Sequence, residues 1–145
     1  MSDVLTLSQI RMPGTARSKD DAIREAGQML VDAGAVTPEY IDSMFDRERS
    51  VSTYMGNYLA IPHGTNEAKE SIKRSALSVI RYPEPIDWDG NEVLFALGIA
   101  GYQGGHMDIL SRIALVFSDT DEVDKMVAAK SAEEIYDLLN AVNEE

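Results

Sequence analysis

The stretch from Val93 to Ala100 is almost wholly apolar, and it constrains the fold more than any other part of the chain. A strand with one face in water alternates apolar and polar residues, whereas a strand covered on both faces reads as a continuous apolar run. The stretch is therefore predicted to be a central strand of a sheet that is covered on both faces. It ends in the glycine-rich segment Gly101–Gly105, after which His106 opens a segment with a wide apolar helical face.

The remaining elements are predicted from hydrophobic periodicity, helix-capping residues and turn residues. Helical patterns cover residues 18–34, 37–48 and 66–73, and others start at His106, Thr120 and Ser131, the last with Glu134 in a capping box. The β-prone runs are residues 58–62 and 76–82, and a turn is expected at residues 88–91. The order mixes α and β elements, with helices outnumbering strands. Because no repeat or low-complexity linker divides the chain, we expect a single domain over residues 1–145.

Composition excludes several classes of function. The chain has 145 residues and a formal net charge of -12, so its surface would repel a phosphate backbone and nucleic-acid binding is not expected. No apolar run approaches the roughly 20 residues that span a bilayer, and the first residues lack the features of a signal peptide. We therefore expect a cytoplasmic protein with no direct membrane insertion. The absence of cysteine excludes disulfides, thiolate nucleophiles and Cys-based metal sites.

The chain has two histidines, and each stands beside glycine where a predicted strand gives way to a loop or helix. Open α/β sheets place their ligands at such junctions. His63 follows a proline that stiffens the approach, and Gly64 presents no side chain to crowd an incoming group, which suits an exposed nucleophile. His106 precedes a helix, where free backbone N–H groups favour anions. A surface or helix-capping histidine would also fit either position, and the local pattern leaves both interpretations open.

Arg47 and Arg49 fall at the end of the second predicted helix. There they would offset the helix dipole, and a planar guanidinium is also the best clamp for a phosphoryl group. Thr65 adds a hydroxyl donor beside Gly64, so we treat Arg49, Thr65 and Gly64 as weaker phosphate-binding candidates. Nucleotide-binding, zinc-protease and serine-hydrolase motifs are missing from the sequence. No metal site or cofactor is expected.

Taken together, these pieces resemble the IIA component of the bacterial sugar phosphotransferase system, of the mannitol/fructose type. The match runs in order over nearly the whole chain. The segments that carry it are Asp46–Arg49, Tyr54–Gly56, Leu59–Thr65 and His106 before Ile109–Leu110. Three further segments look more like the mannitol branch than the fructose or nitrogen-regulatory branches, namely Thr37–Ile41, Asn66–Lys69 and Arg81–Glu84.

The resemblance implies an α/β fold, a three-layer α/β sandwich in which a small mixed β-sheet is flanked by helices on both faces. It also implies a phosphocarrier that takes a phosphoryl group from the carrier protein HPr and gives it to a cysteine of a IIB component. By the same match, His63 is the phosphorylated histidine, His106 the second active-site histidine and Arg47 the arginine beside them. The acceptor would be a separate IIB component or the IIB domain of a IICB permease, and the sugar mannitol. The alternative is a regulatory module of the nitrogen branch, in which phosphorylation changes protein partners.

Overall fold

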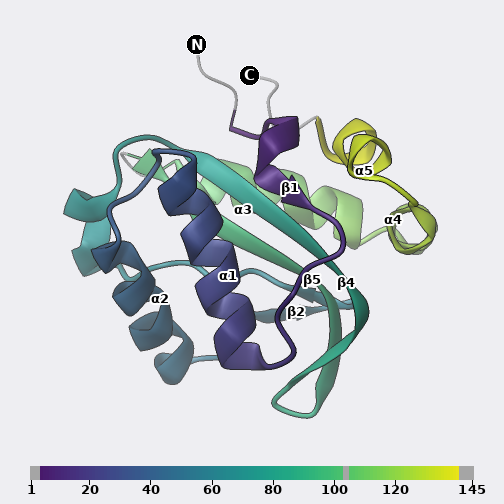
Figure 1. The fold of residues 1–145 in the computed structure, drawn as a ribbon, viewed down its shortest axis with the longest axis horizontal. Helices are drawn as coiled ribbons and strands as arrows, with labels where there is room; N and C mark the ends of the chain where they lie inside the picture. Colours follow the sequence, from purple (N-terminus) through teal and green to yellow (C-terminus); the bar gives the residue numbers. More distant parts are fainter. Residues whose placement is uncertain (1–3, 103–104, 141–145) are drawn as a thin grey trace.

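A five-stranded mixed sheet forms the middle of the molecule (Figure 1). The computed structural model describes residues 4–102 and 105–140. The strands lie in the order β1-β4-β5-β3-β2, with β1 parallel to β4, β3 parallel to β5, and the other neighbours antiparallel. Their bounds are β1 (Ile10–Arg11), β2 (Tyr54–Gly56), β3 (Leu59–Ala60), β4 (Ala76–Trp88) and β5 (Asn91–Ala100). The predicted central strand is therefore confirmed, since β5 lies third among the five strands.

Strand β4 is longer than the sequence predicted. It continues past Tyr82 to Trp88 and turns into β5 through Asp89 and Gly90, both with positive φ. The predicted run stops at Tyr82, and the next residues include Pro83 and Pro85, which cannot donate to a strand ladder. In the structure the pairing register shifts between Arg81 and Ile86, so these prolines lie in an irregularity that needs no ladder hydrogen bond from them.

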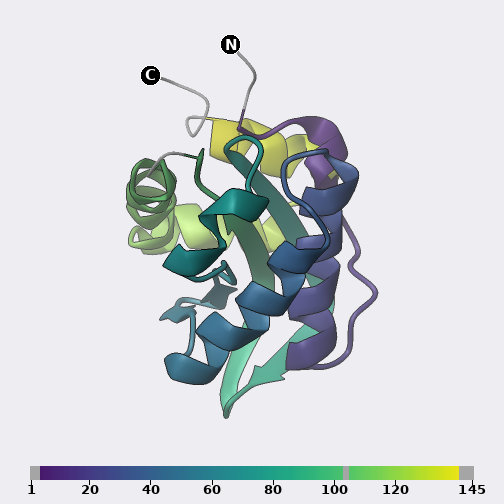
Figure 2. The ribbon, with the colours of Figure 1, turned by 90° about the vertical axis from the view of Figure 1, so that its left-hand side faces the viewer.

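Helices cover both faces of the sheet, which confirms the three-layer α/β sandwich (Figure 2). One face carries α1 (Lys19–Asp32) and α2 (Glu39–Ser50), and the other carries α3 (His106–Phe117), α4 (Thr120–Ala128) and α5 (Ala132–Leu139). Two short 3-10 helices, η1 (Leu7–Gln9) and η2 (Asn66–Ser71), complete the described elements. In the part of the chain that the structure describes, no helix is both long and apolar enough to cross a membrane.

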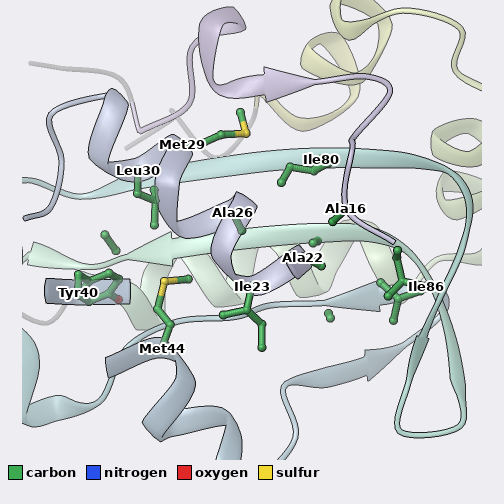
Figure 3. Packing of buried hydrophobic residues seen from close by; sticks show 14 of the residues in the cluster. Ala16, Ala22, Ile23, Ala26, Met29, Leu30, Tyr40, Met44, Ile80 and Ile86 are labelled. Carbon is green, nitrogen blue, oxygen red and sulfur yellow. The ribbon is translucent and has the colours of Figure 1, made fainter. Parts of the chain in front are cut away.

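Two hydrophobic clusters separate according to the alternation of side chains along β5. Phe95, Leu97 and Ile99 join the cluster under α3, α4 and α5, whereas Ala96 and Ala100 join the cluster under α1 and α2. The second cluster is drawn in Figure 3, where Ala22 and Ala26 of α1 lie over the sheet. The small side chains on that face let α1 approach closely.

Most predicted helix starts are confirmed, with two corrections. Ser18 caps α1 by accepting from the backbone N–H of Asp21, and Ser131 caps α5 by accepting from Glu134. Helix α4 begins at Thr120 as predicted, but its cap is Asp119, whose side chain accepts from the backbone N–H of Asp121. The helix predicted over residues 37–48 begins later, at Glu39 after Pro38, and its N-cap forms no side-chain hydrogen bond.

Candidate functional site

The candidate site lies at the carboxyl ends of the parallel neighbours β3 and β5. His63 continues past β3 and forms an isolated parallel bridge with Ile99, and the backbone N–H of Ile99 donates to Pro62 at 3.1 Å. Strand β5 ends one residue later, at Ala100, and α3 begins at His106. The two histidine-bearing connections therefore leave the same edge of the sheet from adjacent strands, where open α/β sheets bind ligands. The side chain of His106, and Gly104 before it, lie outside the described residues.

The ring of His63 is half-buried and oriented by a backbone carbonyl. Its Nδ1 lies 2.7 Å from the carbonyl oxygen of Ile61. A carbonyl can only accept a hydrogen bond, so Nδ1 carries the proton and donates. In the neutral ring the lone pair then lies on Nε2, which makes Nε2 the nucleophilic nitrogen.

Tyr40 of α2 clamps the loop that carries His63. Its hydroxyl donates to the carbonyl of Ile99 at 2.7 Å and accepts from the backbone N–H of Gly64 at 2.8 Å. Burial raises the pKa of Tyr40 to about 12, against a smaller lowering by the Gly64 hydrogen bond, so the hydroxyl stays neutral near pH 7. Figure 3 shows the Tyr40 ring within the core under α2. Periodicity had assigned Tyr40 only to an apolar stripe, although a buried tyrosine hydroxyl usually has a partner.

Gly64 is required by this close contact with α2. A Cβ placed on Gly64 would lie 2.4 Å from Oγ of Ser43 and 2.5 Å from the Tyr40 ring, distances that real Cβ atoms do not show. Both of those atoms belong to buried residues, so a larger residue at position 64 would displace the loop. The glycine therefore fixes how closely the His63 loop approaches α2. The half-buried Thr65 follows, and its carbonyl accepts from Ala68 at 3.1 Å at the start of η2.

Arg47 lies on the same side of the site. It is one helical turn after Ser43, and its Nη1 donates to the carbonyl of Val51 at 2.8 Å. The backbone N–H of Ile61 donates to the carbonyl of Thr53 at 3.1 Å, in the register that pairs β2 with β3. Val51 and His63 each lie two residues beyond this bond, on the two segments that it joins. The Arg47 guanidinium is therefore bound to a segment that is hydrogen-bonded to the segment of His63.

Arg49 lies elsewhere on α2. Its side chain is 70% exposed and forms an ion pair with Asp46. It lines a shallow groove on the outer surface between α1 and α2, together with residues that include Arg24 and Phe45. Successive helical residues project about 100° apart, so Arg47 and Arg49 face different sides of the helix. Of the two arginines, only Arg47 is seen to be tied to the strand register that leads to His63.

Large apolar side chains are exposed next to the candidate residues. Val51, which binds Arg47, is 64% exposed, and Met107, which follows His106, is 59% exposed. Tyr102, in the connection from β5 to α3, is 47% exposed. Exposed large apolar side chains beside functional residues are typical of a surface that docks another protein.

Comparisons with known proteins give matches over nearly the whole chain. Residues 3–142 match the family described as phosphoenolpyruvate-dependent sugar phosphotransferase system, EIIA 2. A relative from Staphylococcus aureus strain Mu50, named mannitol-specific phosphotransferase enzyme IIA component, is 51% identical over 139 residues, which are 96% of each chain.

Two solved structures extend the comparison. The complex of enzyme IIAMTL and phosphorylated enzyme IIBMTL from Escherichia coli contains a chain that matches with a TM-score of 0.86 and 31% identity, covering 93% of this chain and 96% of that one. The nitrogen regulatory protein IIA-Ntr from Neisseria meningitidis matches with a TM-score of 0.78 and 28% identity, covering 94% and 96% of the two chains.

Proposed function

The chain belongs to the EIIA 2 family of the phosphoenolpyruvate-dependent sugar phosphotransferase system, and from that premise we propose that it is a phosphocarrier that uses His63. His63 accepts a phosphoryl group from phosphorylated HPr and passes it to a cysteine of a IIB component. The observation that carries the proposal is the hydrogen bond from Nδ1 of His63 to Ile61, which leaves Nε2 as the nucleophile. Since the Staphylococcus aureus relative is named for mannitol, mannitol is the proposed sugar.

The chemistry is an in-line phosphoryl transfer in two steps. Nε2 of His63 attacks the phosphorus of the phosphohistidine on HPr, the new N–P bond forms as the old one breaks, and the HPr imidazole leaves with the electron pair. The thiolate of the IIB cysteine then attacks the same phosphorus, and the His63 imidazole leaves in turn. The donor and the acceptor are both protein side chains, so this sequence requires no metal or cofactor.

The other predicted residues stabilise the charge that spreads over the equatorial oxygens of the phosphoryl group. Arg47 supplies guanidinium donors, and His106 supplies a ring donor at the first residue of α3. Gly64 lets the His63 loop approach α2, and Thr65 is assigned a weaker phosphate contact. Arg49 faces the outer groove between α1 and α2 and is given no part in the transfer. The exposed side chains of Val51 and Met107 supply the apolar rim on which HPr and then IIB dock.

Mapping of the labelled residue tests the proposal. The protein is incubated with phosphoenolpyruvate, enzyme I and HPr, and the acid-labile phosphate is located by mass spectrometry. We expect the label on His63, none in the His63→Ala variant, and slower labelling of His63 in the matched His106→Ala variant. Label on His106, or undiminished label in His63→Ala, contradicts the proposal.

Onward transfer separates the carrier from a regulatory module of the nitrogen branch, whose fold this chain shares. The phosphorylated protein is mixed with a mannitol-type IIB domain, and phosphate is followed on the IIB cysteine. A variant of the domain with serine at that cysteine is the control. We expect rapid loss of phosphate to the cysteine-bearing domain alone. A phosphoprotein that is stable beside the active IIB domain favours the regulatory alternative.

A further inference from the structure

Glu48 is a buried carboxylate between the two arginines of α2, and the proposed phosphoryl transfer does not use it directly. We propose that Glu48 is a positioning residue that aims Arg47 at the phosphoryl group on His63. This inference rests on the proposed function, and it assigns a second task to the last turn of α2. Glu48 touches neither the phosphoryl group nor the partner, so its effect passes through Arg47.

Glu48 connects three parts of the fold. Its side chain is 4% exposed. Oε2 accepts from the backbone N–H of Thr53 at 2.8 Å and from Nε1 of Trp88 on β4 at 3.1 Å, while Oε1 accepts from the hydroxyl of Thr53 at 2.5 Å. The ammonium of Lys19, at the start of α1, lies 3.7 Å from Oε2. The carboxylate therefore ties the end of α2 both to the segment that enters β2 and to the β4–β5 hairpin.

The tied segment is the one that holds Arg47. Two residues before Thr53 stands Val51, whose carbonyl accepts from Arg47. The carbonyl of Thr53 itself accepts from the backbone N–H of Ile61, two residues before His63. Thr53 donates two hydrogen bonds to Glu48, and this gives the carbonyl of Val51, two residues away, a defined position. The guanidinium that binds this carbonyl is positioned through it, and a positioned charge costs less reorganisation at the transition state.

Packing alone does not require a charged, hydrogen-bonded side chain at position 48. A buried carboxylate carries a large desolvation penalty, and an apolar side chain of similar volume usually serves stability as well or better. Oε1 of Glu48 accepts a hydrogen bond from the hydroxyl of Thr53, which is buried. Two of the three donors to Glu48 come from Thr53, so the network fixes the short segment that links α2 to β2.

The test compares Glu48→Met with Glu25→Met in single-turnover transfer from phosphorylated HPr. Glu25 on α1 is the matched control, because it is also a buried, multiply hydrogen-bonded carboxylate and its partners lie in residues 11–16 and on β4. We expect Glu48→Met to slow the transfer about tenfold with HPr affinity unchanged, since a small misplacement of a catalytic group has effects of this order. Glu25→Met should leave the rate of the folded protein within about twofold of the parent.

A double-mutant cycle tests whether the effect passes through Arg47. Arg47→Ala should slow the transfer by about a hundredfold, and Glu48→Met in that background should change the rate by no more than about twofold. In Glu48→Gln the amide oxygen can keep the two N–H donors on Oε2, and its NH2 can donate to the Thr53 hydroxyl, which reverses. This conservative variant should restore most of the rate.

Two further measurements keep the proposal testable if Glu48→Met does not fold. The chain has a single tryptophan, so the indole N–H signal of Trp88 reports the Glu48 bond without ambiguity in NMR spectra. Thr53→Val, which removes only the hydroxyl donor, should slow transfer a few-fold, by about twofold to fivefold, with the same dependence on Arg47.

The outcomes are distinct. A parent protein that takes no phosphate from HPr contradicts the proposed function itself. An active parent with full activity in folded Glu48→Met, or with additive losses in the double variant, contradicts the positioning role of Glu48 and leaves the function of His63 standing.

Discussion

Glu25 and Glu48 are two buried carboxylates with nearly the same set of partners. Each accepts from a threonine through both its backbone N–H and its hydroxyl, and each accepts from an aromatic side chain of β4, Tyr82 or Trp88. A cation completes each cluster, at 2.9 Å for Glu25 and at 3.7 Å for Glu48. The two carboxylates accept hydrogen bonds from similar groups. We therefore infer that the functions of the two clusters differ because each cluster holds a different segment in place.

The Glu25 cluster holds the segment that leads from the edge strand β1 into α1, and the Glu48 cluster holds the segment that leads from α2 into β2. The first lies at the β1 edge of the sheet, whereas the second contains Thr53, whose carbonyl accepts from Ile61, two residues before His63. The same buried group therefore supports the fold in one place and the candidate site in the other. Loss of Glu25 should be seen in stability, and loss of Glu48 in transfer rate.

The largest expected effect is on the stability of Glu25→Gln. Each oxygen of Glu25 accepts from a backbone N–H, that of Thr15 on Oε2 and that of Ala16 on Oε1. An amide NH2 must face one of these donors, and neither can reverse. We expect Glu25→Gln to lower the free energy of unfolding by about 3 kcal/mol, measured by denaturant titration. Glu48→Gln, in which only the Thr53 hydroxyl has to reverse, should cost about 1 kcal/mol or less.

If Glu25→Gln and Glu48→Gln lose the same free energy of unfolding, the explanation from donors that can or cannot reverse is wrong. A loss of transfer rate in folded Glu25→Gln would remove the separation between fold and site. Both readouts use the same two proteins, so they can be compared directly.

The fold was largely predictable because its strongest signals are local. The apolar run of β5, the Ser18 and Ser131 caps and the turn after Trp88 each depend on a few neighbouring residues. The positions of His63 and His106 beside strand ends were predictable for the same reason. The short strands β1 and β2 were missed, since two or three residues carry no measurable periodicity and their pairing is set by β4 and β3.

The support of the candidate site was not predictable, because its contacts join residues far apart in the sequence. Tyr40 bonds to Ile99, and Glu48 to Trp88. In sequence both Tyr40 and Glu48 have ordinary interpretations, an apolar stripe and a solvated charge. The glycine at position 64 was recognised, but the ring of Tyr40 that makes it necessary became visible only in the structure.

The second-largest expected effect is the loss, on acidification, of the folding stability that Glu25 contributes. Burial alone would raise the pKa of Glu25, but hydrogen bonds from Thr15, Arg11 and Ala16 outweigh it and lower the pKa from 4.5 to about 2. A carboxylate with a lowered pKa in the folded state stabilises the fold fully above pH 4.5 and loses that contribution as the pH falls toward 2. About 2 kcal/mol of it should be lost by pH 3.

Glu25→Met lacks this titration, so the stability difference between the parent and this variant should shrink across the same range. Denaturant titrations at several pH values between 5 and 2.5 measure it. A difference that stays constant with pH, or grows on acidification, contradicts the assignment of the lowered pKa to Glu25.

The smallest effect separates the two cations. Arg11 donates from Nη1 to Glu25 at 2.9 Å, a charge-assisted hydrogen bond to a buried carboxylate, although the arginine side chain is 42% exposed. The ammonium of Lys19 lies 3.7 Å from Glu48 and 2.7 Å from the exposed Asp89, so its closer ion pair is the one with Asp89 at the surface. Solvent screens exposed pairs, and we expect Arg11→Met to cost about 1 kcal/mol and Lys19→Met about half of that or less. Added salt should weaken the Lys19 contribution more, because its pair with Asp89 lies in water. Denaturant titrations of both variants at low and high salt measure these costs. If Lys19→Met lowers the free energy of unfolding more than Arg11→Met does, or slows transfer as Glu48→Met does, the ammonium helps Glu48 to hold its segment in place.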